Sequence, residues 1–298
     1  MRRSLLAVFL VTLVGCSGAQ TVVDTSEDSQ PLEAPPSEDT GCPAKVWEGD
    51  FHAESSADLT RLEGVTKITG SLTLVSRNSD DEVYEARCDT IHICSFEQLS
   101  CLQDVEGSIR IAQNHMELVN LEGLNRLAHI RGTLTIEHNS VLATLEGLEA
   151  LEAVGGLYLN ENERLVSVEG LGSLETAGAI FIINNNSLTN LDGLSSLRAV
   201  VGDVSLEAND ALTSLSGLSS LVSIGGMLEF LSNYGLESLN GLEGITEIGG
   251  TISFVNNRHL PTCEAEAFIR RLTGAGWHGE PEVQENDDSA TCAAATTR

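Results

Sequence analysis

The chain has 298 residues, of which 41% are hydrophobic and only 4% aromatic, with 28 glycines. Its 16 basic residues face 44 acidic ones, which gives a formal net charge of −28. A field of this sign repels nucleic acid and anionic lipid headgroups, so the composition argues against nucleic-acid binding. Thin layers of leucine, isoleucine and valine fit this composition better than a globule with aromatic anchors.

Residues 1–15 have the features of a lipoprotein signal peptide. Arg2 and Arg3 precede an apolar run, residues 5–14, that is too short to span a bilayer. The run ends Leu-Val-Gly directly before Cys16, which resembles the lipobox of bacterial lipoproteins. That resemblance implies cleavage before Cys16 and a lipid anchor on it, and Ser17 resembles an outer-membrane sorting signal. An ordinary secretory leader is the alternative.

Residues 16–41 are predicted to be an acidic, disordered tether. They contain six acidic residues, no basic residue and Pro31, Pro35 and Pro36. A segment with few apolar residues and strong self-repulsion stays extended. It would hold the folded part away from the membrane surface.

Residues 42–106 are predicted to form an N-terminal cap and an irregular first coil. The fragments 62–64 and 70–74 resemble the repeat that becomes regular further on, and an irregular insertion at about 76–100 interrupts them. Four cysteines fall in this region, and their pairing is left open: Cys42, Cys88, Cys94 and Cys101. An exported protein is expected to form disulfides.

From 107 to 260 one unit repeats every 23 to 25 residues. Each unit opens with a glycine and has an asparagine seven residues later; the pairs are Gly107 and Asn114, Gly132 and Asn139, Gly155 and Asn162, Gly178 and Asn185, Gly202 and Asn209, Gly226 and Asn233, and Gly250 and Asn257. Such a period predicts a solenoid, in which each unit buries its apolar side by stacking on its neighbours.

The unit from Gly132 to Gly155 shows how one coil is built. Leu134 and Ile136 alternate with polar residues, which predicts a short half-buried strand. The leucines that follow are three residues apart, at 142, 145, 148 and 151. This spacing fits neither one stripe of an α-helix nor a strand, so short extended or 3₁₀-like sides are expected.

The repeated glycines and asparagines are both interpreted as scaffold. The glycine is expected to allow either a corner with positive φ or a close approach between coils. The asparagine is expected to bond the backbone of the next coil, so that the column forms a ladder along the stack.

The repeat I/V-x-G-x-L-x-I-x-x-N followed by L-x-x-L-x-G-L-x-x-L resembles the receptor L domain of the insulin and epidermal growth factor receptor families. It is also similar to bacterial surface lipoproteins built from that repeat. The resemblance covers roughly residues 57–260. It implies a mainly β fold, a right-handed parallel β-helix or leucine-rich solenoid of about eight coils. It also implies a recognition scaffold, since one sheet face meets the ligand in those receptors.

Residues 261–298 are predicted to form a small C-terminal cap and tail. The segment from Cys263 to Leu272 has a helical pattern, with Ala267, Phe268 and Leu272 available to one face. A disulfide between Cys263 and Cys292 would join this helix to the tail, and the cap would cover the last coil.

Two motifs suggest chemistry but have simpler interpretations. The group Cys88, His92, Cys94 and Cys101 has the residue types of a zinc site but not the spacing of a common one. Residues 274–279 match GxGxxG, but they follow a helix instead of opening one, so a turn is expected and nucleotide binding is not.

Four carboxylates occupy the same place in successive coils: Glu122, Glu146, Glu169 and Asp192. A solvated acidic face is the expected arrangement. The alternative is that Ca²⁺ bridges some of them.

The outward strand positions are expected to form one column: Thr73, Arg110, Thr135, Tyr158, Phe181, Ser205, Glu229 and Ser253. Tyr158 and Phe181 are on adjacent coils, and Ile183 and Leu231 are on the neighbouring outward column. Aromatic and aliphatic side chains on a flat sheet suggest a partner-binding patch. Coverage by the insertion or by a loop is the alternative.

The leading hypothesis is a lipid-anchored cell-envelope module for recognition or adhesion. The protein would bind an unknown protein or glycan, contact the membrane only through its anchor, and use no cofactor. It would face the periplasm or the cell exterior from the outer membrane. The alternatives are a purely structural envelope protein or a polysaccharide-acting β-helix enzyme. Only Arg110 and Glu229 are charged in the outward column, which argues against an enzyme.

Overall fold

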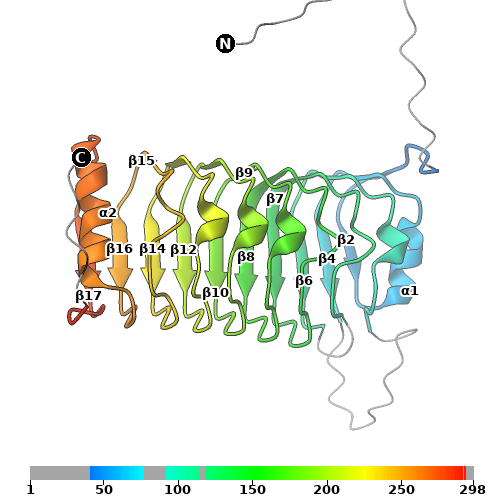
Figure 1. The fold of residues 1–298 in the computed structure, drawn as a ribbon. Helices are drawn as coiled ribbons and strands as arrows, with labels where there is room; N and C mark the ends of the chain where they lie inside the picture. Colours follow the sequence, from blue (N-terminus) through cyan, green and yellow to red (C-terminus); the bar gives the residue numbers. More distant parts are fainter. Residues whose placement is uncertain (1–40, 77–91, 115–117, 291, 293–298) are drawn as a thin grey trace, which may run out of the picture. The chain divides into compact units, whose positions relative to one another are not determined.

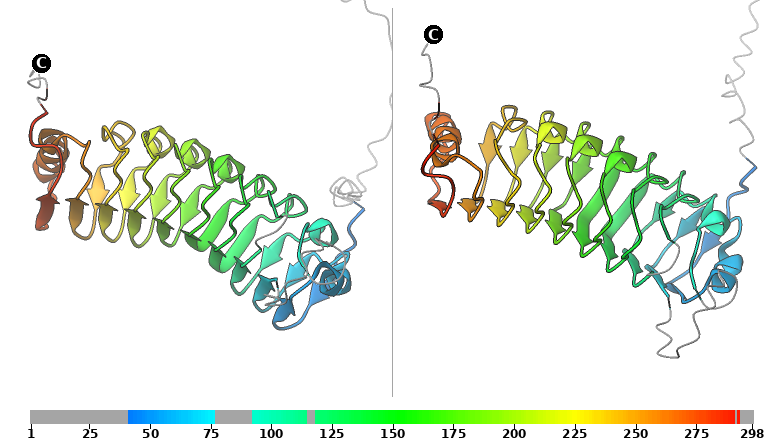
Figure 2. Two further views of the ribbon diagram at one scale, coloured as in Figure 1. Left: turned by 90° about the horizontal axis from the view of Figure 1, so that it is seen from below. Right: turned by 60° about the horizontal axis from the view of Figure 1, so that its bottom comes forward.

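The computed structural model describes residues 41–76, 92–114, 118–290 and 292. The predicted lipidation site at Cys16, the tether and Cys88 lie outside these residues. The described chain from residue 41 onward is a parallel β-solenoid of about eight coils, as predicted (Figure 1). The coils stack in chain order, and the orange helix α2 (Thr262–Gly274) lies across one end (Figure 2).

Most coils contribute one strand to each of two layers of parallel strands, the long-strand sheet and the short-strand sheet, which the two continuous strands β7 and β8 join. The long-strand sheet contains β2 (Phe51–Ala53), β4 (Leu72–Val75), β6 (Ile109–Ala112), the second halves of β7 (His129–Glu137) and β8 (Ala153–Asn160), β10 (Ile180–Ile183), β12 (Val204–Glu207), β14 (Leu228–Leu231), β16 (Ile252–Val255) and β17 (Pro281–Gln284). The short-strand sheet contains β1 (Val46–Trp47), β3 (Lys67–Ile68), β5 (Asp104–Val105), the first halves of β7 and β8, β9 (Thr176–Ala177), β11 (Ala199–Val200), β13 (Ser223–Ile224) and β15 (Glu247–Ile248).

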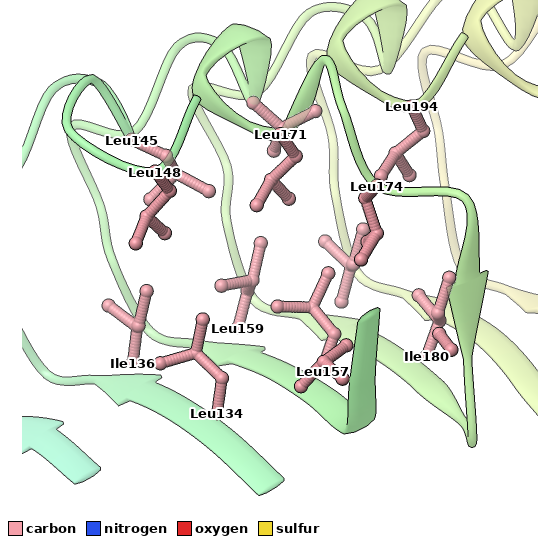
Figure 3. Close-up of a cluster of buried hydrophobic side chains, with 14 of the residues drawn as sticks. Leu134, Ile136, Leu145, Leu148, Leu157, Leu159, Leu171, Leu174, Ile180 and Leu194 are labelled. Carbon is pink, nitrogen blue, oxygen red and sulfur yellow. The ribbon is translucent and has the colours of Figure 1, made fainter. Parts of the chain in front are cut away.

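The third side of the coils holds the leucines spaced by three. It forms turns and 3₁₀ helices: η1 (Thr60–Leu62), η2 (Glu97–Leu99), η3 (Glu169–Leu171), η4 (Asp192–Leu194) and η5 (Ser216–Leu218). Leu145 and Leu148 point from this side toward Ile136 of the long-strand sheet (Figure 3). These side chains are fully buried, so the prediction of inward strand residues and 3₁₀-like sides is confirmed.

The repeated glycines work through close packing. A Cβ on Gly178 would lie 1.8 Å from the carbonyl oxygen of Gly155, a distance that no side chain can occupy. None of the seven glycines that open the repeat has a positive φ, so of the two predicted roles the close approach between coils is the one present. The left-handed conformation falls instead on the residue before each ladder asparagine, as at His138 with φ 54° and Glu161 with φ 53°. The strand ends there, and one residue reverses the backbone before the buried asparagine.

The asparagine ladder is present as predicted. The backbone N–H of Asn139 donates to Oδ1 of Asn162 at 3.2 Å, and the same contact links Asn162 to Asn185 at 3.1 Å. Nδ2 of Asn162 donates to the carbonyl of Ile136 at 2.9 Å. All seven ladder asparagines are buried, and burial is tolerated because these polar groups are bonded. The column is therefore scaffold.

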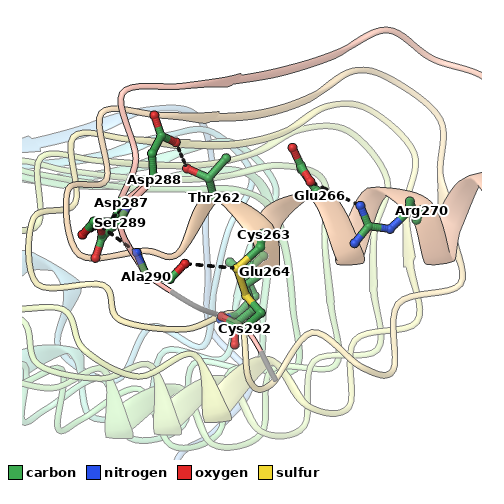
Figure 4. The surroundings of a disulfide bond; sticks show 11 residues. Thr262, Cys263, Glu264, Glu266, Arg270, Asp287, Asp288, Ser289, Ala290 and Cys292 are labelled. Carbon is green, nitrogen blue, oxygen red and sulfur yellow. Dashed lines mark hydrogen bonds and ion pairs between the residues drawn. A yellow bond between two sulfur atoms is a disulfide. The ribbon is translucent and has the colours of Figure 1, made fainter. Parts of the chain in front are cut away.

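The C-terminal cap closes the last coil through α2, β17 and a disulfide. Cys263 and Cys292 are bonded as predicted, with their Cα atoms 6.1 Å apart (Figure 4). The buried face of α2 consists of Ala265, Phe268 and Leu272. Ala267 is exposed, so its predicted place on this face is wrong; it is one residue before Phe268, about 100° around the helix.

At the other end, α1 (Ser56–Leu59) lies beside the first coils, and a disulfide joins Cys42 to Cys101. Cys94 is also disulfide-bonded. Oxidised cysteines do not provide thiolate ligands, so the zinc interpretation of Cys94 and Cys101 is wrong.

Candidate interaction surface

The long-strand sheet brings the predicted column together. In register, Tyr158 pairs with Phe181, Phe181 with Ser205, and Ser205 with Glu229. The rings of Tyr158 and Phe181 are stacked, with centroids 4.9 Å apart and planes 13° from parallel. Both side chains are partly exposed on the outer face of the sheet.

Gly156 makes room for the Tyr158 ring. It occupies the outward position before Tyr158 on β8, and a Cβ there would lie 2.9 Å from a ring carbon of Tyr158. The ring therefore lies over a residue without a side chain. The absence of a side chain at position 156 thus leaves space for the Tyr158 ring, which stacks on Phe181 of the next coil.

The aliphatic residues of the predicted patch are only partly brought together. Ile183 and Leu231 are on the same outward column, but Glu207 pairs with both and separates them. The contiguous apolar surface is therefore Tyr158, Phe181 and Ile183, which we call the aromatic patch. Leu231 lies beyond Glu207.

Polar side chains border the aromatic patch. On its N-terminal side, Nε of Arg110 donates to Oε1 of Glu137 at 2.7 Å. On the other side, Oγ of Ser205 donates to Oε2 of Glu229 at 3.2 Å, and Ser205 is only 2% exposed. An apolar centre with a polar rim is the usual anatomy of a protein-binding surface. Coverage of this face by the insertion was the alternative, and residues 77–91 of the insertion lie outside the described residues.

The acidic column lies on the third side of the coils. Glu122, Glu146, Glu169 and Asp192 are exposed, and Oδ1 of Asp192 accepts a hydrogen bond from Ser216 Oγ at 2.5 Å. Over the described residues, no three His, Cys, Asp or Glu side chains are grouped so as to hold a metal ion. Calcium bridging stays a prediction, which melting temperatures with Ca²⁺ and with a chelator would test.

A parallel β-solenoid with an asparagine ladder and an aromatic patch on its outer face fits a binding module. The family model described as Receptor L domain matches residues 64–192, so the resemblance seen in the sequence is confirmed. The family is a non-enzymatic, ligand-binding domain. The matched residues include the whole aromatic patch and stop short of Leu231.

No curated protein and no solved structure matches the chain. In the part of the chain that the structure describes, no helix has the length and apolarity to cross a bilayer.

Proposed function

We propose that the chain is a lipid-anchored recognition or adhesion module of the bacterial cell envelope. It binds a protein or glycan partner through the outer face of the long-strand sheet. The observation that carries the proposal is the stacked pair of Tyr158 and Phe181, which exposes aromatic surface on a rigid scaffold. The family match to a binding domain supports it.

The aromatic patch favours a protein partner over a glycan. Ile183 extends the patch with an aliphatic side chain, and the rings of Tyr158 and Phe181 face each other along the stack instead of lying open. Apolar side chains bordered by ion pairs and hydrogen bonds suit the core and rim of a protein interface. The net charge of −28 further favours a partner with a basic rim.

The envelope location is supported by the leader ahead of Cys16 and by the disulfides Cys42–Cys101 and Cys263–Cys292, which persist in oxidising compartments. Membrane attachment requires more than one acyl chain to be stable, and a lipidated Cys16 would supply several. Changing Cys16→Ser should release the protein from the membrane fraction. In a separate experiment, protease treatment of intact cells that carry the wild-type chain would distinguish a surface-exposed chain from a periplasm-facing one.

The aromatic patch is tested by the double variant Tyr158→Ala with Phe181→Ala. Saturable binding of the labelled chain to intact cells and to isolated envelopes should weaken by about tenfold or more, since aromatic residues at the centre of an interface that act as hot spots contribute about 2 kcal/mol or more. Tyr234→Ala is the matched control, because Tyr234 is an exposed aromatic outside both sheets.

Unchanged binding by the double variant would show that the aromatic patch is structural. A wild-type chain that binds no cell or envelope component at any concentration would favour a purely structural envelope protein.

A further inference from the structure

A second group of polar side chains lies on the short-strand sheet, away from the aromatic patch. His129 lies between two carboxylates, with Nδ1 3.0 Å from Asp104 and Nε2 3.7 Å from Glu152. Oε1 of Glu106 lies 2.6 Å from Nζ of Lys67 and 4.0 Å from Nη1 of Arg131. The residues come from neighbouring coils, because β3, β5 and β7 are paired in register. We call these six residues the polar cluster.

The polar cluster borders a groove. A hollow of about 550 Å³ is lined by Asp104, by His129 to Arg131 and by Ala153 to Gly155. A smaller one of about 170 Å³ lies against Lys67 and Glu106, and a third of about 380 Å³ extends to Asn125 and Arg126. Asp104 and His129 border all three, so the hollows adjoin one another, and we call the three together the groove.

The groove lies where long outward side chains on one coil are followed by short ones at the equivalent positions of the next coil. His129 pairs with Ala153, and Gly155 packs so closely that a Cβ on it would lie 2.2 Å from the carbonyl oxygen of Arg131. Long side chains thus form a wall beside a floor of alanine and glycine. Because the sheet fixes both, the hollow is present before any ligand arrives. Its size falls within the range of small-molecule sites.

The lining selects a class of ligand. Lys67 and Arg131 are balanced by Asp104, Glu106 and Glu152, so the cluster presents no excess positive charge to an anion. Ile130 and Val154 also line the larger hollow, but their side chains are buried, with 2% and 4% of their surface exposed. None of the described lining residues is aromatic, so a lipid or an aromatic ligand would gain little. Carboxylates accept hydrogen bonds, whereas guanidinium and ammonium groups donate them. A hydroxyl group does both.

We propose that this groove binds a neutral oligosaccharide. Its hydroxyl groups would donate to Asp104 and Glu152 and accept from Arg131 and Lys67, while its C–H surface would rest on Ala153 and Gly155. The ion pairs hold the charged groups in place, which lowers the cost of ordering them when the ligand binds. This site is independent of the proposed partner-binding face, because it lies on the other sheet.

The test uses the full chain on an array of neutral, uronate-containing and amino-sugar oligosaccharides, followed by calorimetric titration of a neutral oligosaccharide that binds. Asp104→Asn and Arg131→Gln should each weaken that affinity about tenfold, as expected for hydrogen bonds to charged groups. Ala153→Phe should fill the floor and abolish binding. Ala199→Phe is its matched control, because residue 199 lies two coils further along the same column.

Retained secondary structure and melting temperature in Asp104→Asn keep the result interpretable if Ala153→Phe fails to fold. The proposal is overturned if no neutral oligosaccharide binds, if only acidic or amino sugars bind, or if binding survives Asp104→Asn and Ala153→Phe. Loss of sugar binding in the Tyr158 and Phe181 double variant would move the sugar site to the other sheet. Failure of the aromatic patch as a partner site leaves the expected sugar titration unchanged, so the two proposals fail separately.

Discussion

The backbone N–H of Asn257 donates to Oδ1 of Asn286 at 3.0 Å, although 29 residues separate them along the chain. Asn286 in turn donates from Nδ2 to the carbonyl of Phe254 at 2.7 Å. These are the contacts that the ladder asparagines from Asn139 to Asn257 make with the neighbouring coil. The ladder therefore continues into the cap, and the last regular coil does not end on an unpaired corner.

Asn185 should be essential for stability, and the adjacent Asn186 should not. Asn185 accepts the N–H of Asn162 and donates to the carbonyl of Leu159 at 3.0 Å. Asn185→Ala would leave buried backbone groups unpaired and should lower the free energy of unfolding by about 2–4 kcal/mol. Asn186 is exposed, so Asn186→Ala should change the free energy of unfolding by less than about 0.5 kcal/mol. Urea unfolding of both variants decides this, and equal effects would contradict the ladder.

Gly178 should tolerate no side chain. Gly178→Ala would place a Cβ 1.8 Å from a backbone carbonyl oxygen, so the coils must separate, at a cost of about 1–3 kcal/mol or more. Gly274 at the end of α2 has nothing within 4 Å of the same position. Gly274→Ala should therefore be neutral or slightly stabilising in the same unfolding measurement. A harmless Gly178→Ala would show that the stack is looser than the structure indicates.

The disulfide between Cys263 and Cys292 should hold the cap on the last coil. It closes a loop of 29 residues, worth about 3.6 kcal/mol in the chain-entropy model. Changing both cysteines to alanine should lower stability by up to this amount. Hydrogen exchange should increase first in β17, whose strand follows α2 and is the last in the sheet. Uniformly faster exchange over all coils would instead indicate that the cap controls the whole stack.

The free energy of unfolding should depend on pH through the ionisation of Glu106. Its hydrogen bond to Lys67 lowers the pKa of Glu106 below the ordinary value of 4.5. A folded pKa below the unfolded one stabilises the protein above about pH 4.5, and this contribution is lost as the pH falls through the lowered value. Lys67→Met should remove this part of the acid sensitivity. Urea midpoints at about pH 6 and about pH 3 measure it, and an unaltered difference in Lys67→Met would exclude the ion pair as its source.

The patch and the polar cluster differ in how far the sequence predicts them. Tyr158 and Phe181 are one repeat apart, so a regular stack places them side by side. Leu231 was expected in the same patch, but Glu207 lies between Ile183 and Leu231. Two residues on the same outward column need not be neighbours, because the residue between them can be polar. Lys67 and Asp104 lie on either side of the insertion, which breaks the repeat spacing and hides their pairing in the sequence.

The sequence by itself determined the coil, its inward leucines, the asparagine column and the Cys263–Cys292 bond. It did so because each repeat forms one coil of the stack, so residues one repeat apart in the sequence become neighbours in space. Only the tertiary structure decided what depends on irregular spacing or on side-chain packing. That includes the Cys42–Cys101 bond, the hydrogen bond from Asn257 to Asn286 that extends the ladder, the stacked rings of Tyr158 and Phe181 over Gly156, and the groove beside His129. In each case the contact depends on a sequence separation that differs from the repeat period or on how a side chain is oriented. The repeat period predicts neither of these.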